Sequence, residues 1–205
     1  MIIDRPKATT KTGMSERSIA RVLALGFFAR KYLVMVPNCN WTGHECDLLA
    51  LDEKLRVIDV EVKISRADLK ADAHKDKWFH YWDWRIDGPY RSGAANERRR
   101  REWPQKVWKH YYCMPKDIWS DELFDVLPST RSGVLLITYE KNGELRIALK
   151  RRAQANKDAK PVSPESAVNI ARLASLRMWE WEIRAAAAGD ELRRFREVAR
   201  QQEAK

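Results

Sequence analysis

Three residues with the chemistry of a metal-dependent hydrolase stand close together in the first third of the chain. Asp47 lies in "ECDLLAL", and Glu61 and Lys63 lie in "IDVEVKIS", with 13 residues between the aspartate and the glutamate. Two carboxylates held near one another repel unless a cation lies between them, and Mg²⁺ prefers such oxygen ligands together with water and phosphate. A lysine beside that ion would contact a phosphate or orient an attacking water. The residues therefore fit metal-assisted hydrolysis of a phosphodiester.

The chain around these residues alternates polar and apolar side chains, which predicts two β-strands joined as a hairpin. In the second strand the even positions are Ile or Val, and the odd positions carry the charges of Asp59, Glu61 and Lys63. We expect Glu61 and Lys63 to face a metal and a phosphate, and Asp59 to face solvent near the edge of the sheet. The alternative is a ladder of exposed ion pairs on a half-exposed strand.

Side-chain matching also predicts the register of this hairpin. A turn at residues 53–55 places Asp47 opposite Glu61 and gathers the apolar residues of both strands, Cys46 included, on the other face. A slip of one residue would put acids among the apolar side chains, which a buried face does not tolerate.

The remaining pattern predicts an α/β protein with a helical C-terminal extension. Residues 1–14 are expected to form a flexible tail, and residues 85–106 a basic loop or insertion. Further strands are expected at 31–37, 106–114, 133–140 and 144–152. Helices are expected to begin at Ser15, Ser65, Lys116, Ser163 and Glu191, with Gly189 and Asp190 separating the last two.

The composition favours an anionic partner. The sequence has 39 Lys and Arg against 29 Asp and Glu, a formal charge of +10. This surplus suits nucleic acid first and an acidic membrane surface second, and a contribution to solubility alone is the alternative. No apolar run approaches the roughly 20 residues that span a bilayer, and the N-terminus lacks the apolar stretch of a signal peptide. We therefore expect a cytoplasmic protein with no membrane partner, associated with the nucleoid when bound to DNA.

Three cysteines without regular spacing do not predict a disulfide framework. The segment "CNWTGHEC" offers Cys39, His44 and Cys46 to zinc. A structural zinc site usually takes four ligands from recognisable pairs, and the sequence shows no matching second pair. We expect these cysteines to be core residues instead.

Asp47 followed by Glu61-Val62-Lys63, in the order helix, strand, strand, strand, resembles the PD-(D/E)XK nuclease superfamily. More narrowly, "VIDVEVKISRADLKAD" leading into "KWFHYWD" resembles the MmcB-like group of DNA-repair proteins. The resemblance covers about residues 15–152. It implies a restriction-endonuclease-like fold, in which helices flank a mixed central sheet. Residues 153–205 have no counterpart in it and form the C-terminal extension.

The resemblance also implies roles for individual residues. Asp47 and Glu61 would bind Mg²⁺ or Mn²⁺ together with the backbone carbonyl of Val62, and Lys63 would be the catalytic lysine. Further candidates for the same site are Glu16, Glu45, Ser65, Asp68 and Lys77. Asp68 and Asp72 stand four residues apart on one helix, so they either reach the site or form a solvated helix face.

Basic residues supply candidates for contact with a phosphate backbone. These are Arg98, Arg99, Arg100, Arg101, Lys106, Arg193 and Arg194. The leading hypothesis is a Mg²⁺-dependent deoxyribonuclease, of the endonuclease type, acting in DNA repair, recombination or the processing of phage and mobile-element DNA. A non-catalytic DNA-binding or scaffold module is the alternative, and an RNA-directed enzyme is a third hypothesis. The C-terminal helices would serve a homodimer or bind a protein partner.

Overall fold

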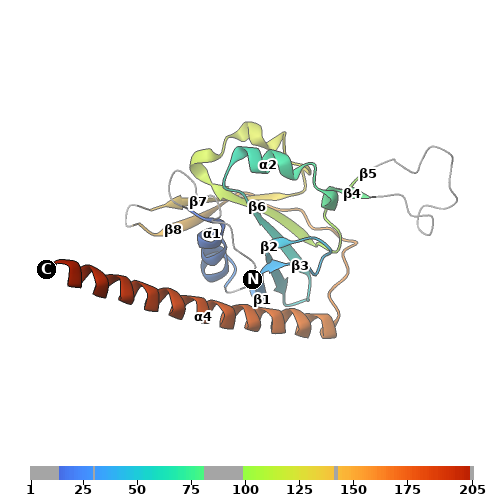
Figure 1. Ribbon diagram of the computed structural model, residues 1–205. Coiled ribbons are helices and arrows are strands. Elements are labelled where there is room, and N and C mark those ends of the chain that lie inside the picture. The colour runs from blue at the N-terminus through green and yellow to red at the C-terminus, as the bar shows by residue number, and fades with distance from the viewer. Residues whose placement is uncertain (1–13, 30, 81–98, 141–142, 204–205) are drawn as a thin grey trace, which may run out of the picture.

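The computed structural model describes residues 14–29, 31–80, 99–140 and 143–203, with side chains as far as Glu191. Its centre is a six-stranded sheet in the order β1-β2-β3-β6-β7-β8 (Figure 1). The strands are Tyr32–Cys39, Cys46–Asp52, Val57–Val62, Lys109–Pro115, Gly133–Tyr139 and Leu145–Arg151. β3 and β7 pair with β6 in parallel, and the other neighbours are antiparallel. The expected α/β class with a mixed central sheet is confirmed.

Helix starts follow the capping signals in the sequence. Ser15 caps α1 (Glu16–Val22) in a reciprocal capping box with Ser18, and α1 continues into the π-helical turn η1 (Leu23–Phe27). Ser65 caps α2 (Arg66–Asp72), because its hydroxyl accepts a hydrogen bond from the amide of Asp68. These two caps fix the residue at which each helix begins beside the sheet.

Other segments differ from the sequence expectation. α2 ends at Asp72, and the chain continues through the 3₁₀ turn η2 (Asp76–Trp78) into the two-residue strand β4 (Phe79–His80). β4 pairs with β5 (Arg99–Arg100), so the end of the basic segment is strand rather than loop, while residues 85–98 lie outside the described residues. The helix expected from Lys116 is two 3₁₀ turns, η4 (Lys116–Ile118) and η5 (Asp121–Phe124).

The two faces of the sheet are covered differently. α1 and η1 cover one face, where Ile19 and Leu23 pack against Val60 and Leu135 in one apolar cluster. On the other face, α2 and η2 cover the β6–β7 side and the start of α4 (Pro164–Glu203) covers the β1–β2 side. The central strand β3 is therefore enclosed on both sides, and all six of its residues are buried.

The hairpin register is the expected one wherever the strands pair. Leu48 lies opposite Val60 and Leu51 opposite Val57. The loop has the expected three residues, with Leu55 at φ +55 closing the turn in the left-handed conformation. This register directs Asp59, Glu61 and Lys63 to one face of β3, as the alternation predicts.

Two expectations on these strands are wrong. Asp59 does not face solvent at a sheet edge: β3 is the third of six strands, and the Asp59 side chain is fully buried. Cys46 does not pack with the even positions Leu48 and Ala50, but joins the cluster of Leu49 on the opposite face. Asn38, on the neighbouring strand, has φ +51, and this local irregularity interrupts the alternation at the strand ends.

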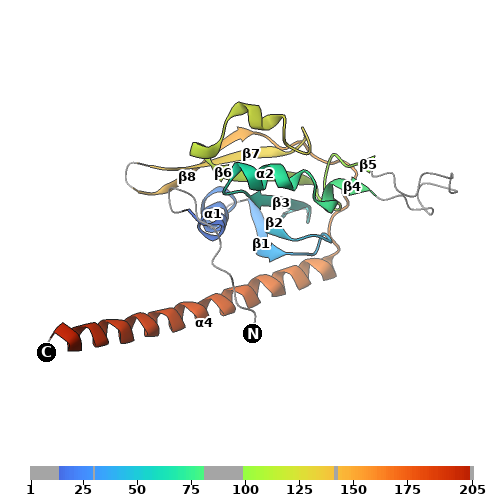
Figure 2. The same cartoon turned by 45° about the horizontal axis from the view of Figure 1, so that its top comes forward.

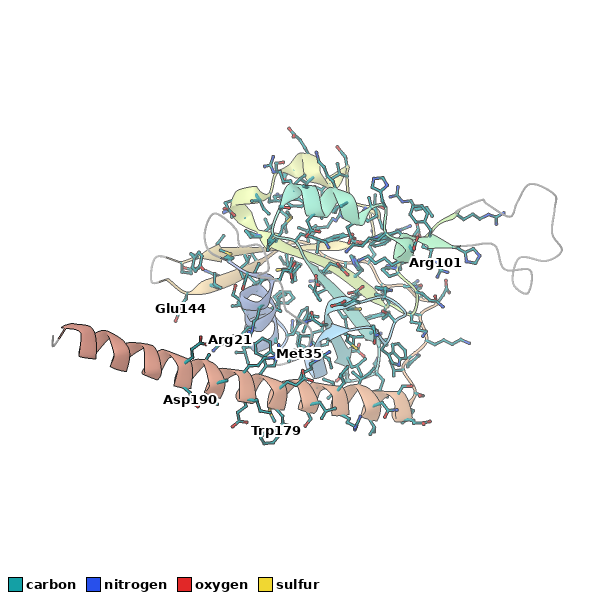
Figure 3. The ribbon with its side chains drawn as sticks, viewed as in Figure 1. Arg21, Met35, Arg101, Glu144, Trp179 and Asp190 are labelled. Carbon is teal, nitrogen blue, oxygen red and sulfur yellow. The ribbon has the colours of Figure 1, made fainter. Side chains whose placement is uncertain are left out.

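The C-terminal region is one helix rather than two. α4 runs 40 residues, through Gly189 and Asp190, and so extends for about 60 Å (Figures 1 and 2). It begins as expected, with Pro164 as its first residue and the Ser163 hydroxyl accepting a hydrogen bond from the amide of Ser166. Ile170 packs on the sheet, whereas Trp179 is exposed and points away from the body of the protein (Figure 3).

Three further expectations concern the chain as a whole. Among the residues that the structure describes, none of the helices combines the length and apolar character that crossing a bilayer requires. All three cysteines are buried and free, as expected of core residues. Residues 1–13 of the expected tail lie outside the described residues, and Met14 is buried in the cluster of Ile19 and Leu23.

Candidate functional site

The site begins where the β2–β3 hairpin stops pairing through its backbone. The last paired residues are Leu48 and Val60, and the next position of the register brings Asp47 beside Glu61. Here Oδ2 of Asp47 accepts a hydrogen bond of 2.7 Å from the amide of Val62. The Asp47 side chain thus takes the place of a main-chain acceptor, which fixes its carboxylate against β3.

A pocket of about 430 Å³ opens at this point. It is lined by Glu16, Glu45, Asp47, Glu61, Val62, Lys63, Ile64, Ser65, Asp68 and Lys75. Five carboxylates therefore meet two lysines on the wall of this pocket, in a chain whose net charge is +10. The structure brings together all the residues expected at the site except Lys77, which lies behind Glu61, and it adds Lys75.

Asp47 is a half-buried carboxylate whose charge its neighbours compensate only in part. Burial raises its pKa to about 7, with the neighbouring charge of Glu61 acting in the same direction, and the Val62 amide and Lys63 only partly oppose this. Asp47 and Glu61 therefore repel each other when both are ionised. Such a pair gains from a cation that touches both.

Lys63 lies in the floor of the pocket with only 2% of its side chain exposed. Its Nζ donates a 2.9 Å hydrogen bond to Oε2 of Glu61 and lies 3.1 Å from Oδ1 of Asp72. Burial alone would lower the pKa of Lys63, but these two carboxylates outweigh it and hold the pKa well above the ordinary value. The side chain is therefore a fixed ammonium ion in a single position.

Lys77 occupies the other side of Glu61. Its Nζ lies 2.7 Å from Oε1 of Glu61 and 3.3 Å from Oδ2 of Asp72, and its side chain is 2% exposed. The 2.7 Å contact is an ion pair without hydrogen-bond alignment, since neither atom has a hydrogen-bond partner among the described residues. Burial opposes the charge of Lys77, yet Glu61 and Asp59 raise its pKa overall. Lys77 thus supports Glu61 from inside the protein.

Asp72 joins these lysines into one network. Its Oδ2 accepts hydrogen bonds from Tyr112 Oη at 2.6 Å and from Trp78 Nε1 at 3.0 Å, and the residue is fully buried. Burial would raise the pKa of Asp72, but Lys77 and Lys63 hold it well below the ordinary value. A solvated helix face is therefore the wrong description for Asp72.

Asp68, one turn before Asp72 on α2, is in a different environment. The Asp68 side chain is 37% exposed at the pocket, 3.9 Å from Lys63 Nζ. The four-residue spacing of Asp68 and Asp72 does not predict this difference. Asp72 is buried because α2 ends there and the chain turns back, which places Lys77 against Asp72.

The basic residues expected to meet phosphate lie in different surroundings. Arg99 and Arg100 are exposed on β5, near η2. Arg101, beside the short β4–β5 ribbon (Figure 3), is half-buried and donates to the carbonyl of Phe79. Lys106 lies over the ring of Trp41, in a different pocket. Arg98 and the side chains of Arg193 and Arg194 lie outside the described residues.

Comparison with known proteins adds one structural likeness. No family model matches the chain, and no curated protein matches it. The solved structure of SPO1766, a protein of unknown function from Silicibacter pomeroyi, is similar with a TM-score of 0.48 and 18% identity, over 84% of this chain and 90% of that one.

Proposed function

We propose that this chain is a metal-dependent DNA nuclease of the PD-(D/E)XK type, with a restriction-endonuclease-like fold. The observation that carries the proposal is the meeting of Asp47, Glu61 and Lys63 in one pocket at the end of the β2–β3 hairpin. Asp47 and Glu61 would hold Mg²⁺ or Mn²⁺, with the Val62 carbonyl as a further ligand. Lys63 would act on the phosphate.

The donor set of the pocket suits a hard divalent cation. Carboxylates outnumber lysines by five to two on its wall, and the Asp47 carboxylate lacks a lysine of its own among the described residues. Oε1 of Glu61 is buried and is paired with Lys77 Nζ at 2.7 Å, so a metal ion would bind Glu61 beside this lysine. Mg²⁺ binds through one or two carboxylates and keeps several waters, which leaves room for a phosphate oxygen.

The acidic wall also bears on how DNA would enter. A phosphodiester brought into this pocket without a cation would face an excess of negative charge, so binding of substrate and of metal should depend on each other. The bound ion would neutralise charge on the phosphate and lower the pKa of a bound water. The exposed Arg99 and Arg100, near η2, would hold the flanking backbone.

Lys63 has the fixed position that charge stabilisation requires. Glu61 and Asp72 hold its ammonium group, so it needs no rearrangement as negative charge develops on the phosphate. Asp72 would orient Lys63, and Lys77 would orient Glu61, from the interior of the protein and without contacting the substrate. In this scheme Asp47, Glu61 and Lys63 act on the metal, water and phosphate, and the buried network positions them.

The test is cleavage of plasmid, linear, single-stranded and branched DNA in Mg²⁺, Mn²⁺ or EDTA. We expect metal-dependent cutting that falls by roughly 10²-fold or more in Lys63→Ala, as for loss of one preorganised donor. Lys70→Ala, an exposed lysine on α2, is the matched control and should cut like the wild type.

Cutting that persists in EDTA, or that Lys63→Ala leaves unchanged, would refute the proposal. Absence of cutting by any form, together with DNA binding that survives both EDTA and Asp47→Asn, would favour the non-catalytic binding module.

A further inference from the structure

A second group of metal-binding atoms lies outside the pocket. A ring nitrogen of His44, Sγ of Cys46 and a carboxylate oxygen of Asp59 all lie within 4.8 Å of one another. Cys46 and Asp59 are buried, and 17% of the His44 side chain is exposed. The group combines nitrogen, sulfur and oxygen donors, whereas the pocket of Asp47 and Glu61 offers oxygen donors from carboxylates.

The geometry is close to that of a tetrahedral zinc site. His44 Nε2 lies 3.2 Å from Oδ2 of Asp59. A tetrahedral ion with bonds of about 2.0–2.3 Å places its ligand atoms roughly 3.3–3.8 Å apart. All three donor atoms already lie within 4.8 Å of one another, so they would need to approach by about 1 Å at most to reach that spacing.

Two buried atoms in this region lack partners within the described part of the chain. Oδ1 of Asp59 and Nε2 of His110 are both buried and neither takes part in a hydrogen bond there. His110 Nε2 lies 3.9 Å from Oδ2 of Asp59, and its other ring nitrogen is 3.0 Å from the hydroxyl of Ser132. An unpaired carboxylate oxygen in the interior costs free energy, and either a water or a metal ion would satisfy it.

The charges of these donors also match zinc. Cysteine binds zinc as a thiolate and aspartate as a carboxylate, so the two negative charges equal the charge of Zn²⁺. With neutral His44 the whole group is then neutral, which is the form that a buried position accepts most readily.

Local hydrogen bonds hold the segment that carries His44 and Cys46 in a defined conformation. The amide of Gly43 donates to the carbonyl of Asn40, and Gly43 has φ +100, a conformation that suits glycine. The Thr42 hydroxyl donates to the carbonyl of His44 at 2.9 Å and lies 3.4 Å from Cys46 Sγ. These contacts hold His44 and Cys46 on the same side of the loop.

We propose that His44, Cys46 and Asp59 bind one Zn²⁺ ion, with a water molecule as the fourth ligand and His110 Nε2 facing that water. The ion would fasten the loop before β2 to the centre of β3, two residues before Glu61. With three protein ligands and a water this would be an open zinc site rather than a closed four-ligand one, and it would lie apart from the pocket that Asp47 and Lys63 line. The proposal does not depend on the nuclease hypothesis.

The test uses the whole purified chain, stripped of metal and titrated with Co²⁺ and Zn²⁺. We expect one equivalent of Zn²⁺ by elemental analysis. The Co²⁺ form should show a thiolate-to-cobalt charge-transfer band in the near ultraviolet and the strong visible bands of tetrahedral cobalt. Both bands should disappear in Cys46→Ala. In His44→Gln the affinity for Co²⁺ should fall at least tenfold. Cys113→Ala, which removes a buried thiol elsewhere in the core, should keep both bands.

Two further variants separate this site from the pocket. Glu61→Gln should retain the cobalt–thiolate band, because an ion held by Asp47 and Glu61 has no sulfur ligand. Circular dichroism checks that each variant folds, and His44→Gln tests the site at a partly exposed position if Cys46→Ala does not fold. The proposal is overturned if the wild type binds no more Zn²⁺ or Co²⁺ than His44→Gln, or if bound Co²⁺ shows no thiolate band.

Discussion

Lys77 Nζ lies 2.7 Å from Oε1 of Glu61, although only 2% of the Lys77 side chain is exposed. Lys63 holds the other oxygen of the same carboxylate, and Asp72 contacts both lysines. A buried charge of this kind is stable only while its partners remain, because removing one leaves the others uncompensated in a medium of low polarity. The network therefore couples the geometry of the pocket to the stability of the fold.

The first prediction concerns this coupling. Lys77→Met should lower the free energy of unfolding by about 3–5 kcal/mol, because it removes one of the two buried cations that Glu61 and Asp72 share and leaves their negative charge in excess. Lys75→Met is the matched control: Lys75 contacts the same two carboxylates, but half of its side chain is exposed, so its loss should cost about 1 kcal/mol or less. Urea unfolding of both variants measures the difference. Equal, small losses would show that Lys77 does not support Glu61.

The second prediction concerns the pH dependence of Asp47. Its folded pKa, about 7, lies above the ordinary value of 3.8, so folding favours the protonated form. The stability due to this group is complete below about pH 4 and is lost as the pH rises through 7. Asn resembles the protonated carboxyl, so Asp47→Asn should match the wild type near pH 4.

At pH 8 the same variant should be more stable than the metal-free wild type. A pKa unit corresponds to about 1.4 kcal/mol, and allowing for water in the pocket we expect a gain of roughly 1–3 kcal/mol. Mg²⁺ should raise the melting temperature of the wild type at pH 8 and leave Asp47→Asn unchanged. A variant that is less stable than the wild type at both pH values would contradict this account of Asp47.

The sequence predicts the local features of the fold well, because they depend on neighbouring residues. The register from Leu48 to Leu51 follows from alternation on two adjacent strands, and Ser15 and Ser65 cap their helices through hydrogen bonds within one turn. The meeting of Asp47 with Glu61 is a consequence of that register. These parts of the candidate site can therefore be placed from the amino-acid pattern alone.

Features that depend on distant segments cannot be placed in this way. Alternation shows that Asp59 shares a face with Glu61, but it does not show that η2 covers that face or that β6 pairs with β3 and makes it an inner strand. The role of Asp72 depends on Tyr112, forty residues away, and on the turn that returns Lys77. Gly189 is typical of a helix end, yet the helix propensity of the flanking alanines and charged residues carries α4 through it.

The third prediction concerns contact with DNA. Arg99 and Arg100 are exposed near η2, and each phosphate contact contributes about 0.9 to the slope of log affinity against log salt for duplex DNA. The double variant Arg99→Ala/Arg100→Ala should therefore bind more weakly and reduce the slope by roughly 2. Fluorescence anisotropy measures the affinity for DNA, with Ca²⁺ in place of Mg²⁺ to limit cutting. Arg146→Ala, on the outer strand β8, is the control.

If the double variant Arg99→Ala/Arg100→Ala bound more weakly with an unchanged salt slope, this would contradict contact between these arginines and phosphates. An equal change in Arg146→Ala would show that only the net charge of the chain matters.

The fourth prediction compares two glycines in different surroundings. A Cβ on Gly133, the first residue of β7, would collide with the ring of Tyr111 and lie 2.7 Å from the backbone nitrogen of Ala153. Gly133→Ala should therefore destabilise the protein by roughly 2–4 kcal/mol, since neither the buried ring nor the backbone can move freely. Gly189, in the middle of α4, has open space where its Cβ would lie.

Gly189→Ala should instead strengthen α4 by up to about 1 kcal/mol, because alanine has the higher helix propensity. Thermal unfolding and far-ultraviolet circular dichroism measure both variants, and the helical signal should rise or hold in Gly189→Ala. A loss of helical signal there would mean that the glycine ends one helix and starts another, as its sequence context suggests. A neutral Gly133→Ala would mean that Tyr111 does not pack against β7, and the core between β6 and β7 would need a different arrangement.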